Sequence, residues 1–250
     1  MPFGSEQHVL QTGWLRKILW RARGDFHLGR WIRCFYIKKM IRKFSMEPRR
    51  ILDAGCGKGQ TAFFLERRFP GSVVCGVDNF AEEVAFCEAV KRAAGSRVEF
   101  LKTDLTKEFP ANSYDLVVLT NVLSAIRDYQ TALMNVLKGL PQGGWLILQD
   151  MNLASLKERC GGKPAYEGQE HTGFYLEELS ELMRSQGLKI LYAAQTLGFF
   201  GDLAHRLFDC VRKSGLLLNI FFPVLKFLAY ADTLFKIEKG SGLLIVGRKC

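Results

Sequence analysis

The sequence predicts an α/β protein built around a doubly wound parallel sheet, and three observations carry this prediction. Short apolar runs alternate with amphipathic segments of helical period between residues 50 and 150. A loop with three glycines at alternate positions follows the first apolar run. Each run also ends in an acid or an amide, which is typical of a ligand site at the carboxyl edge of a parallel sheet.

The elements follow in chain order. Apolar runs predict strands at 50–55, 72–78, 97–104, 114–121 and 143–150. Amphipathic segments predict helices at 60–68, 81–94, 128–140 and 175–187. Because crossovers between parallel strands are right-handed, these helices are expected to cover both faces of the sheet.

Polar side chains close the five predicted strands: Asp53, Asp78, Asp104, Asn121 and Asp150. The carboxyl ends of parallel strands meet at one edge of the sheet, and ligands bind in the crevice beyond that edge. The sequence therefore predicts a ligand site lined largely by acids.

The glycine loop can be interpreted in two ways. A nucleotide diphosphate turn has the spacing G-x-G-x-x-G, whereas here Gly55, Gly57 and Gly59 alternate. The acids at the strand ends would also repel a pyrophosphate. A ligand with cationic groups and hydroxyls, and without phosphate, fits the acids better, and glycines let the backbone approach it closely.

The segment LDAGCGKG, residues 52–59, resembles the first motif of the class I S-adenosylmethionine-dependent methyltransferases of small-molecule type. The resemblance extends over residues 50–150 and implies S-adenosylmethionine as the cofactor. It implies that Asp53 lies near the methionine end of the cofactor. The backbone around Ala54, Gly55, Cys56 and Gly57 is implied to line it.

The same resemblance assigns roles to the later strand ends. Asp78 is implied to accept hydrogen bonds from the ribose hydroxyls, and Asp104 from the exocyclic amine of the adenine. The other positions implied to surround the cofactor are Asn79, Phe80, Thr103, Leu105 and Asn121.

The family has a Rossmann-like, seven-stranded sheet whose last two strands are antiparallel. Residues 188–196 and 242–248 are the candidates for these strands, so the methyltransferase domain is predicted to span residues 49–250. The chain between them is far longer than a hairpin needs and predicts a helical insertion at about 198–240.

Residues 1–48 are predicted to form a separate basic, helical segment. The first 50 residues carry 12 Lys and Arg against three acids, whereas residues 51–250 carry 23 basic and 22 acidic residues. In residues 36–44 the apolar and basic side chains share opposite helical faces, as they do in residues 14–23. Such a helix either binds a membrane interface or packs its apolar face over the cofactor.

The insertion is strongly apolar over residues 215–237, and Pro223 is expected to interrupt any helix there. Polar residues within the run argue against a membrane-spanning helix. Three interpretations remain open: helices packed on the sheet, an apolar lid over the acceptor site, and a membrane-facing surface.

Nucleic acid is the other partner that the sequence pI of about 9.3 suggests. The segment TNVLSAI, residues 120–126, lacks the Asn-Pro-Pro-aromatic motif of enzymes that methylate exocyclic base amines, and no Pro-Cys pair is present. The seven cysteines include no C-x-x-C pair, so no metal site or disulfide framework is predicted. A reducing cytoplasm fits best, because the first 13 residues also lack the apolar core of a signal peptide.

Methyl transfer to a hydroxyl requires a base beside the acceptor. His171 is the preferred candidate because an imidazole titrates near neutral pH, and Asp150 and Tyr166 complete the predicted catalytic set. Many relatives place a histidine after the fourth strand, where this chain has Ser124 and Ala125.

These observations predict a cytoplasmic methyltransferase, peripheral to the inner face of a membrane, that acts at oxygen on a small or lipid-like acceptor by in-line displacement. The alternatives are an RNA methyltransferase and a non-catalytic S-adenosylmethionine-binding protein.

Overall fold

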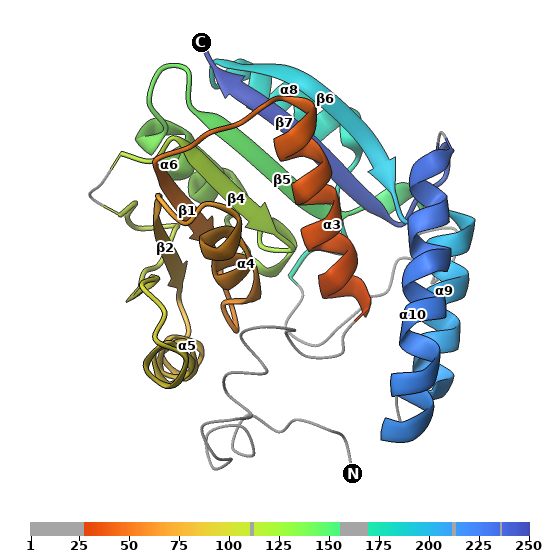
Figure 1. Cartoon of the computed structure of the whole chain (residues 1–250). Helices are drawn as coiled ribbons and strands as arrows, with labels where there is room; N and C mark the ends of the chain where they lie inside the picture. Colours follow the sequence, from red (N-terminus) through yellow and green to blue (C-terminus); the bar gives the residue numbers. More distant parts are fainter. Residues whose placement is uncertain (1–27, 111–112, 156–169, 212–213, 236) are drawn as a thin grey trace.

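A computed structural model describes residues 28–110, 113–155, 170–211, 214–235 and 237–250. Its centre is a seven-stranded sheet in the order β3-β2-β1-β4-β5-β7-β6 (Figure 1). The first five strands pair in parallel, whereas β7 is antiparallel to both of its neighbours. The α/β class, the seven strands and the antiparallel last strand are thereby confirmed. The strands are β1 (Arg50–Ala54), β2 (Val73–Asp78), β3 (Glu99–Lys102), β4 (Leu116–Thr120), β5 (Trp145–Met151), β6 (Leu188–Thr196) and β7 (Gly242–Lys249).

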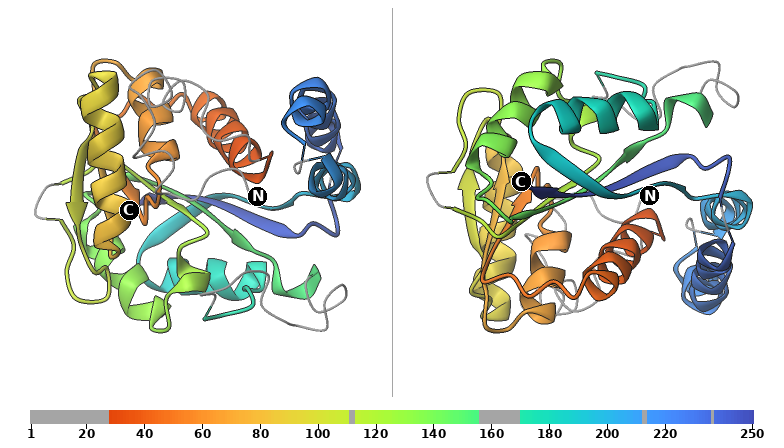
Figure 2. Two further views of the ribbon diagram at one scale, coloured as in Figure 1. Left: turned by 90° about the horizontal axis from the view of Figure 1, so that it is seen from below. Right: turned by 90° about the horizontal axis from the view of Figure 1, so that it is seen from above.

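Helices cover both faces of this sheet (Figure 2). One face carries α3 (Leu28–Lys43), α4 (Gln60–Arg68) and α5 (Ala81–Ala94), and the other carries α6 (Tyr129–Gly139) and α8 (Leu176–Ser185). Alternate residues of each central strand face the two layers: Ile51 packs with α3 and α4, while Leu52 packs with α6. The remaining elements are η1 (Leu123–Ala125), α9 (Phe199–Val211), α10 (Gly215–Ala231) and η2 (Asp232–Leu234).

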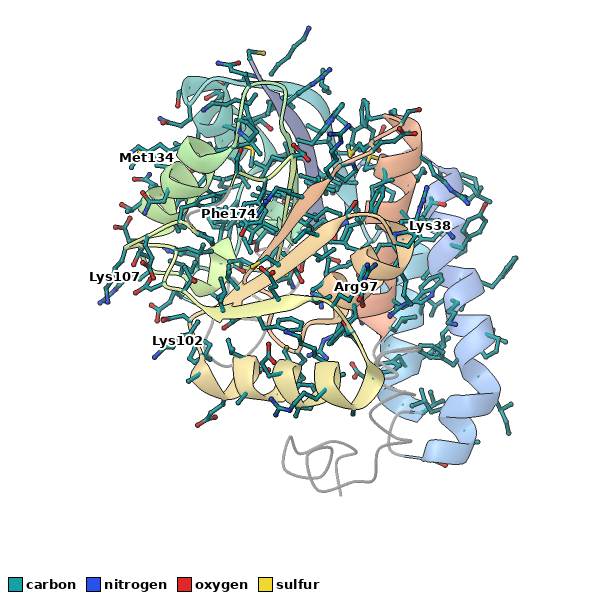
Figure 3. All side chains as sticks on the ribbon, turned by 60° about the vertical axis from the view of Figure 1, so that its left-hand side comes forward. Lys38, Arg97, Lys102, Lys107, Met134 and Phe174 are labelled. Atoms are coloured by element: carbon teal, nitrogen blue, oxygen red, sulfur yellow. The ribbon has the colours of Figure 1, made fainter. Side chains whose placement is uncertain are left out.

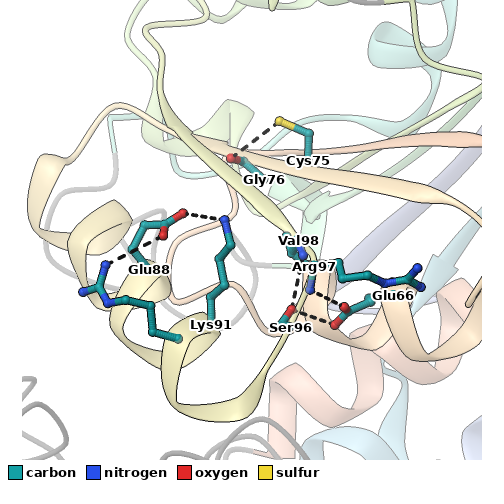
Figure 4. Close-up of polar contacts among 9 residues, drawn as sticks. Glu66, Cys75, Gly76, Glu88, Lys91, Ser96, Arg97 and Val98 are labelled. Atoms are coloured by element: carbon teal, nitrogen blue, oxygen red, sulfur yellow. Dashed lines mark hydrogen bonds and ion pairs between the residues drawn. The ribbon is translucent and has the colours of Figure 1, made fainter.

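A buried carboxylate fixes α4, the helix that follows the glycine loop (Figure 4). Glu66 accepts hydrogen bonds from the Ser96 hydroxyl at 2.8 Å and from the Arg97 amide at 2.7 Å. Both donors belong to the turn between α5 and β3, so α4 is tied to the neighbouring crossover. The glycine loop therefore leads into an anchored helix.

The basic helix α3 is an integral part of this core. Its apolar face is buried in the same cluster as Ile51 and Phe63. This supports the packing interpretation of residues 36–44, although the predicted division of the chain at residue 48 stays a prediction. The second basic amphipathic segment, residues 14–23, lies outside the described residues. The buried side chains of α3 include Leu28, Ile32, Tyr36, Ile37, Met40 and Ile41.

The expectation that Pro223 interrupts the insertion helix was wrong. Helix α10 runs continuously from Gly215 to Ala231 with Pro223 inside it. Proline removes one backbone hydrogen bond from a helix, but packing can offset this loss. Here Phe222 and Leu225 are buried in the core cluster that also holds Phe208 of α9.

The insertion emerges at the carboxyl edge of the sheet. Since β6 is antiparallel to β7, and β7 to β5, β6 runs in the same direction as β5. Helix α9 therefore begins at the edge where the polar strand ends lie, and α10 returns to that edge before β7. They form a hairpin at the side of the molecule, beside α3 (Figures 1 and 2). Among the described residues, no helix combines the length and the apolar character needed to cross a bilayer.

Candidate functional site

The glycine loop connects β1 to α4 and is held against its neighbours by its backbone. The amides of Gly55 and Cys56 both donate to the Val77 carbonyl at 2.8 Å. Gly55 has a φ of +75°, and a Cβ there would lie 2.4 Å from a methyl group of Val122. Only glycine fits this position, because the loop touches the turn that follows β4.

The next glycine of the loop faces open space. Gly57 has a φ of +49°, and no heavy atom lies within 4 Å of where its Cβ would be. Its amide donates to Oδ2 of Asp78 at 2.8 Å. A ligand can therefore approach the backbone at Gly57 closely.

Asp78 connects this loop to the start of α5. Its Oδ1 accepts a hydrogen bond from the Phe80 amide at 3.1 Å, while Oδ2 holds Gly57. Asn79 is exposed, and so is Phe80, whose exposed fraction is 69%. An exposed aromatic ring can stack on a planar base, which is consistent with the predicted contact between Phe80 and the adenine. That contact stays a prediction.

Asp53 is the unusual group of the site. It is 0% exposed, and neither carboxylate oxygen has a hydrogen-bond partner among the described residues. Burial raises its pKa to about 7 and the charge of Asp78 adds to the rise, while the neighbouring Ala62 amide, which makes no regular hydrogen bond with it, and the Arg33 charge oppose the rise. A buried acceptor without a donor is costly, so this carboxylate is suited to receive a cation.

Cys56 and Ala54 line the loop as neutral groups. The side chain of Ala54 is buried in the core on the α6 side. A hydrogen bond with Cys87, together with burial, raises the pKa of the Cys56 thiol well above its ordinary value. Cys56 is therefore a neutral packing group at neutral pH and not a nucleophile.

The end of β3 forms a polar turn. Asp104 accepts hydrogen bonds from the amide and the hydroxyl of Thr106 at 3.0 and 2.7 Å, which hold the pKa of its carboxyl below the usual range. The Lys107 ammonium lies 3.3 Å from the other oxygen. Thr103 is buried, and its amide donates to the Asp78 carbonyl. The Leu105 side chain packs in the core, and its place beside the cofactor stays a prediction.

The ends of β4 and β5 are locked together. Asn121 has a φ of +55° and donates its amide to the Gln149 carbonyl at 2.8 Å. The buried carboxylate of Asp150 accepts from the amides of Met151, at 2.8 Å, and Ser124, at 3.3 Å. These contacts make Asp150 a positioning group for the turn after β4, and its direct part in catalysis stays a prediction.

His171 reaches the same turn from the segment before α8. Its amide donates to the Ser124 carbonyl at 2.9 Å, and its Nε2 lies 2.9 Å from the Arg127 carbonyl. The imidazole packs edge-on against Tyr129, with 5.0 Å between ring centroids. Phe174, which follows it, is buried inside the molecule, as Figure 3 shows.

The structure thus brings two of the three predicted catalytic residues together. Asp150 and His171 both bond to Ser124, one to its amide and one to its carbonyl. Tyr166 lies outside the described residues.

Arg33, which acts on Asp53, and Gln149, which contacts Arg33, were not predicted from the sequence as site residues. The Arg33 charge on α3 acts on Asp53, and the Gln149 amide group donates to the Arg33 carbonyl at 3.5 Å. Gln149 is 4% exposed, and its Oε1 has no partner among the described residues. A lone glutamine within the apolar run WLILQD was the available signal.

The comparisons with known proteins agree with this geometry. Residues 52–146 match a family described as a methyltransferase domain. The chain is 34% identical over 102 residues to demethylmenaquinone methyltransferase of Thermus thermophilus, covering 40% of this chain and 46% of that protein. It is 32% identical over 117 residues to phosphoethanolamine N-methyltransferase 1 of Arabidopsis thaliana, covering 45% and 23%.

The fold also matches solved structures over nearly its whole length. The N-methyltransferase NodS from Bradyrhizobium japonicum, in complex with S-adenosyl-L-homocysteine, superposes with a TM-score of 0.58 at 18% identity. The match covers 98% of this chain and 96% of that one.

Both curated relatives are matched over less than half of their own length. The residues that match the methyltransferase domain include the glycine loop and the ends of β1 to β4, but not Asp150 at the end of β5. Residues 52–146 thus match a methyltransferase domain, and the seven-stranded sheet that carries them has the fold of a solved methyltransferase structure.

Proposed function

We propose that the chain is an enzyme that transfers a methyl group from S-adenosylmethionine to a small or lipid-like acceptor, at oxygen. The observation that carries the proposal is the buried Asp53 carboxylate, which has no partner among the described residues and lies at the root of the glycine loop. A cofactor with a cationic amine supplies the missing charge.

The residues of the carboxyl edge fit this cofactor. Asp53 would hold the amine, and Arg33 is the nearby cation for the carboxylate of the methionine end. The backbone at Gly57 leaves room for close approach, and Asp78 together with the exposed Phe80 ring suits the nucleoside. The bound sulfonium supplies an activated methyl group, so the chain must align the acceptor in line with it and exclude water.

An oxygen acceptor requires that its proton be removed, and we assign this to His171. A carbonyl only accepts hydrogen bonds, so the contact with Arg127 requires that Nε2 carry the proton. The neutral imidazole then has its lone pair on Nδ1, which can take a proton from a hydroxyl as the oxygen–methyl bond forms. Asp150 supports this arrangement by fixing the turn to which His171 is bonded.

The apolar insertion favours a lipid-like acceptor. Helix α9 begins, and α10 ends, at the same edge of the sheet as the glycine loop. An apolar wall there offers little to a strongly hydrated acceptor. For such an acceptor we further propose a cytoplasmic enzyme, peripheral to the inner face of a membrane.

Methyl-labelled S-adenosylmethionine and a cell extract separated into lipid, aqueous and nucleic-acid fractions test the proposal. Label is expected in the lipid fraction, either as a methyl ether, which is stable to alkali, or as a methyl ester, which alkali hydrolyses. His171→Ala should lower turnover by about 100-fold while cofactor affinity is retained. Asp53→Ala should weaken cofactor binding itself.

Other distributions of label would overturn parts of the proposal. Label confined to nucleic acid would favour an RNA methyltransferase, and label on nitrogen or carbon would remove the oxygen assignment. Cofactor binding by calorimetry without transfer to any fraction would indicate a non-catalytic binding protein.

A further inference from the structure

Helix α10 exposes an apolar outer face. Leu217, Ile220, Val224 and Phe227 follow one another at intervals of three or four residues, so they share one side of the helix. Their side chains are 43, 57, 52 and 70% exposed. A helix that covers the surface of a globular protein normally carries charge on its outer face, whereas Lys226 is the single charged residue between Gly215 and Ala231.

Aromatic side chains join this face to α3. The rings of Trp31 and Phe35 stack at 5.7 Å, and Phe35 meets Tyr230 of α10 edge-on at 5.4 Å. The Lys226 ammonium lies 5.5 Å from the Trp31 centroid. The two helices therefore present one continuous surface, which we call the α3–α10 surface.

Cations border this surface on the α3 side. Trp31, Phe35, Lys38 and Arg42 lie at helical intervals on the face of α3 opposite its buried residues; the first three are half-buried and Arg42 is exposed. Lys39 donates to the Thr233 carbonyl at 3.1 Å and so lies against the end of α10. The sequence of α3 contains six basic residues and no acid.

We propose that the α3–α10 surface docks on an anionic lipid bilayer. Apolar side chains that adjoin Trp, Tyr and a row of Lys and Arg have the composition of an interfacial membrane helix. Anionic lipids attract such cations. A second copy of the chain complements the surface less well, because the basic rows of two α3 helices would face each other.

Docking by this surface would bring the cofactor edge to the membrane. The N-terminal end of α3 and the α9–α10 hairpin both lie at the carboxyl edge of the sheet, where the glycine loop is (Figure 1). A lipid-like acceptor could then reach the methyl group without crossing water. This consequence rests on the proposed function, whereas the docking itself does not.

Flotation of the full chain with vesicles tests the proposal. The wild type is expected to float with vesicles of phosphatidylcholine and phosphatidylglycerol, and much less with phosphatidylcholine alone. Val224→Glu with Phe227→Glu should weaken vesicle binding roughly tenfold or more. Lys38→Glu with Arg42→Glu should remove the dependence on phosphatidylglycerol and on salt.

Leu101→Glu is the matched control. Leu101 is 45% exposed on β3, at the opposite edge of the sheet from β6, so this variant should float like the wild type. Retained cofactor affinity and an unchanged circular dichroism spectrum would show that each variant is folded.

The proposal would be overturned if the wild type did not float with vesicles, or if the α10 variants floated as well as the wild type. It would also be overturned if the wild type bound no vesicles and formed a dimer that the α10 substitutions dissociate. Vesicle binding without methyl transfer would instead overturn the proposed function and leave the docking surface intact.

Discussion

At the scale of single residues, the site depends on one carboxylate and one glycine whose surroundings are fixed by packing. Asp53 is buried with no described partner, and Gly55 touches Val122 so closely that no side chain fits between them. The first feature leaves a charge to be satisfied by a ligand, and the second fixes the loop that the ligand contacts. Both can be tested by substitutions that change little else.

Asp53 should make stability and cofactor binding depend on pH. Its pKa of about 7 in the folded chain exceeds the ordinary value of 3.8, so the native state binds more protons between about pH 4 and pH 7. The free energy of unfolding of the cofactor-free protein should therefore fall as the pH rises from about 4 to about 7, by at most about 4 kcal/mol. Denaturant titrations from pH 4 to pH 8 measure this fall, and Asp53→Asn should flatten it.

The same titration predicts that cofactor affinity rises as the pH increases towards 7, because the amine binds the ionised carboxylate. Affinity at pH 6 should be roughly tenfold below that at pH 8. A pH-independent affinity in the wild type would show that Asp53 does not receive the amine.

Gly55 and Gly57 provide a matched pair of substitutions. Gly55→Ala should destabilise the protein by about 2 kcal/mol or more, because its Cβ would collide with Val122. Gly57→Ala has free space and should cost only about 1 kcal/mol, while it obstructs the approach of the cofactor. Thermal melts and calorimetry separate the two effects. Adding Val122→Ala to Gly55→Ala should restore part of the stability, and an additive double variant would contradict the contact.

At the scale of elements, local pattern predicts most of the fold. Residues 188–196 form β6 as predicted, and the segment 81–94 forms α5, because each has an uninterrupted apolar period and clear end signals. The prediction that Pro223 interrupts the helix failed because it used local sequence alone. Helix α10 is stabilised by contacts with distant residues, which a local rule does not include. The same limit applies to the site. The acids at the strand ends could be predicted from the sequence, but the lack of a partner for Asp53 and the hydrogen bond from His171 to Arg127 depend on tertiary structure.

Helix α10 is therefore expected to tolerate Pro223 at a cost. Pro223→Ala should raise stability by about 1–3 kcal/mol, because it restores a backbone amide and removes a steric conflict in a helix interior. Thermal denaturation measures the gain, and Val224→Ala is the control, with a change within about 0.5 kcal/mol. A lower melting temperature for Pro223→Ala would mean that the packing of α10 depends on the proline ring.

At the scale of the whole molecule, the sheet separates two tasks along one edge. The glycine loop, Asp78 and Asp53 occupy the β1–β2 half, which suits the cofactor. Beyond β5 the same edge continues into the α9–α10 hairpin and the α3–α10 surface. Under the proposed function, the cofactor would bind at the first half of this edge and the acceptor would approach from the second.

The place where this hairpin is rooted has an evolutionary consequence. It leaves β6 at Thr196 and rejoins β7 at Gly242, and these two residues are paired neighbours in the sheet. Such an excursion can be exchanged for another of different length without altering the strand order or the cofactor loop. A new segment grafted between these two adjacent backbone positions would therefore change one side of the molecule and leave the rest of the sheet as it is.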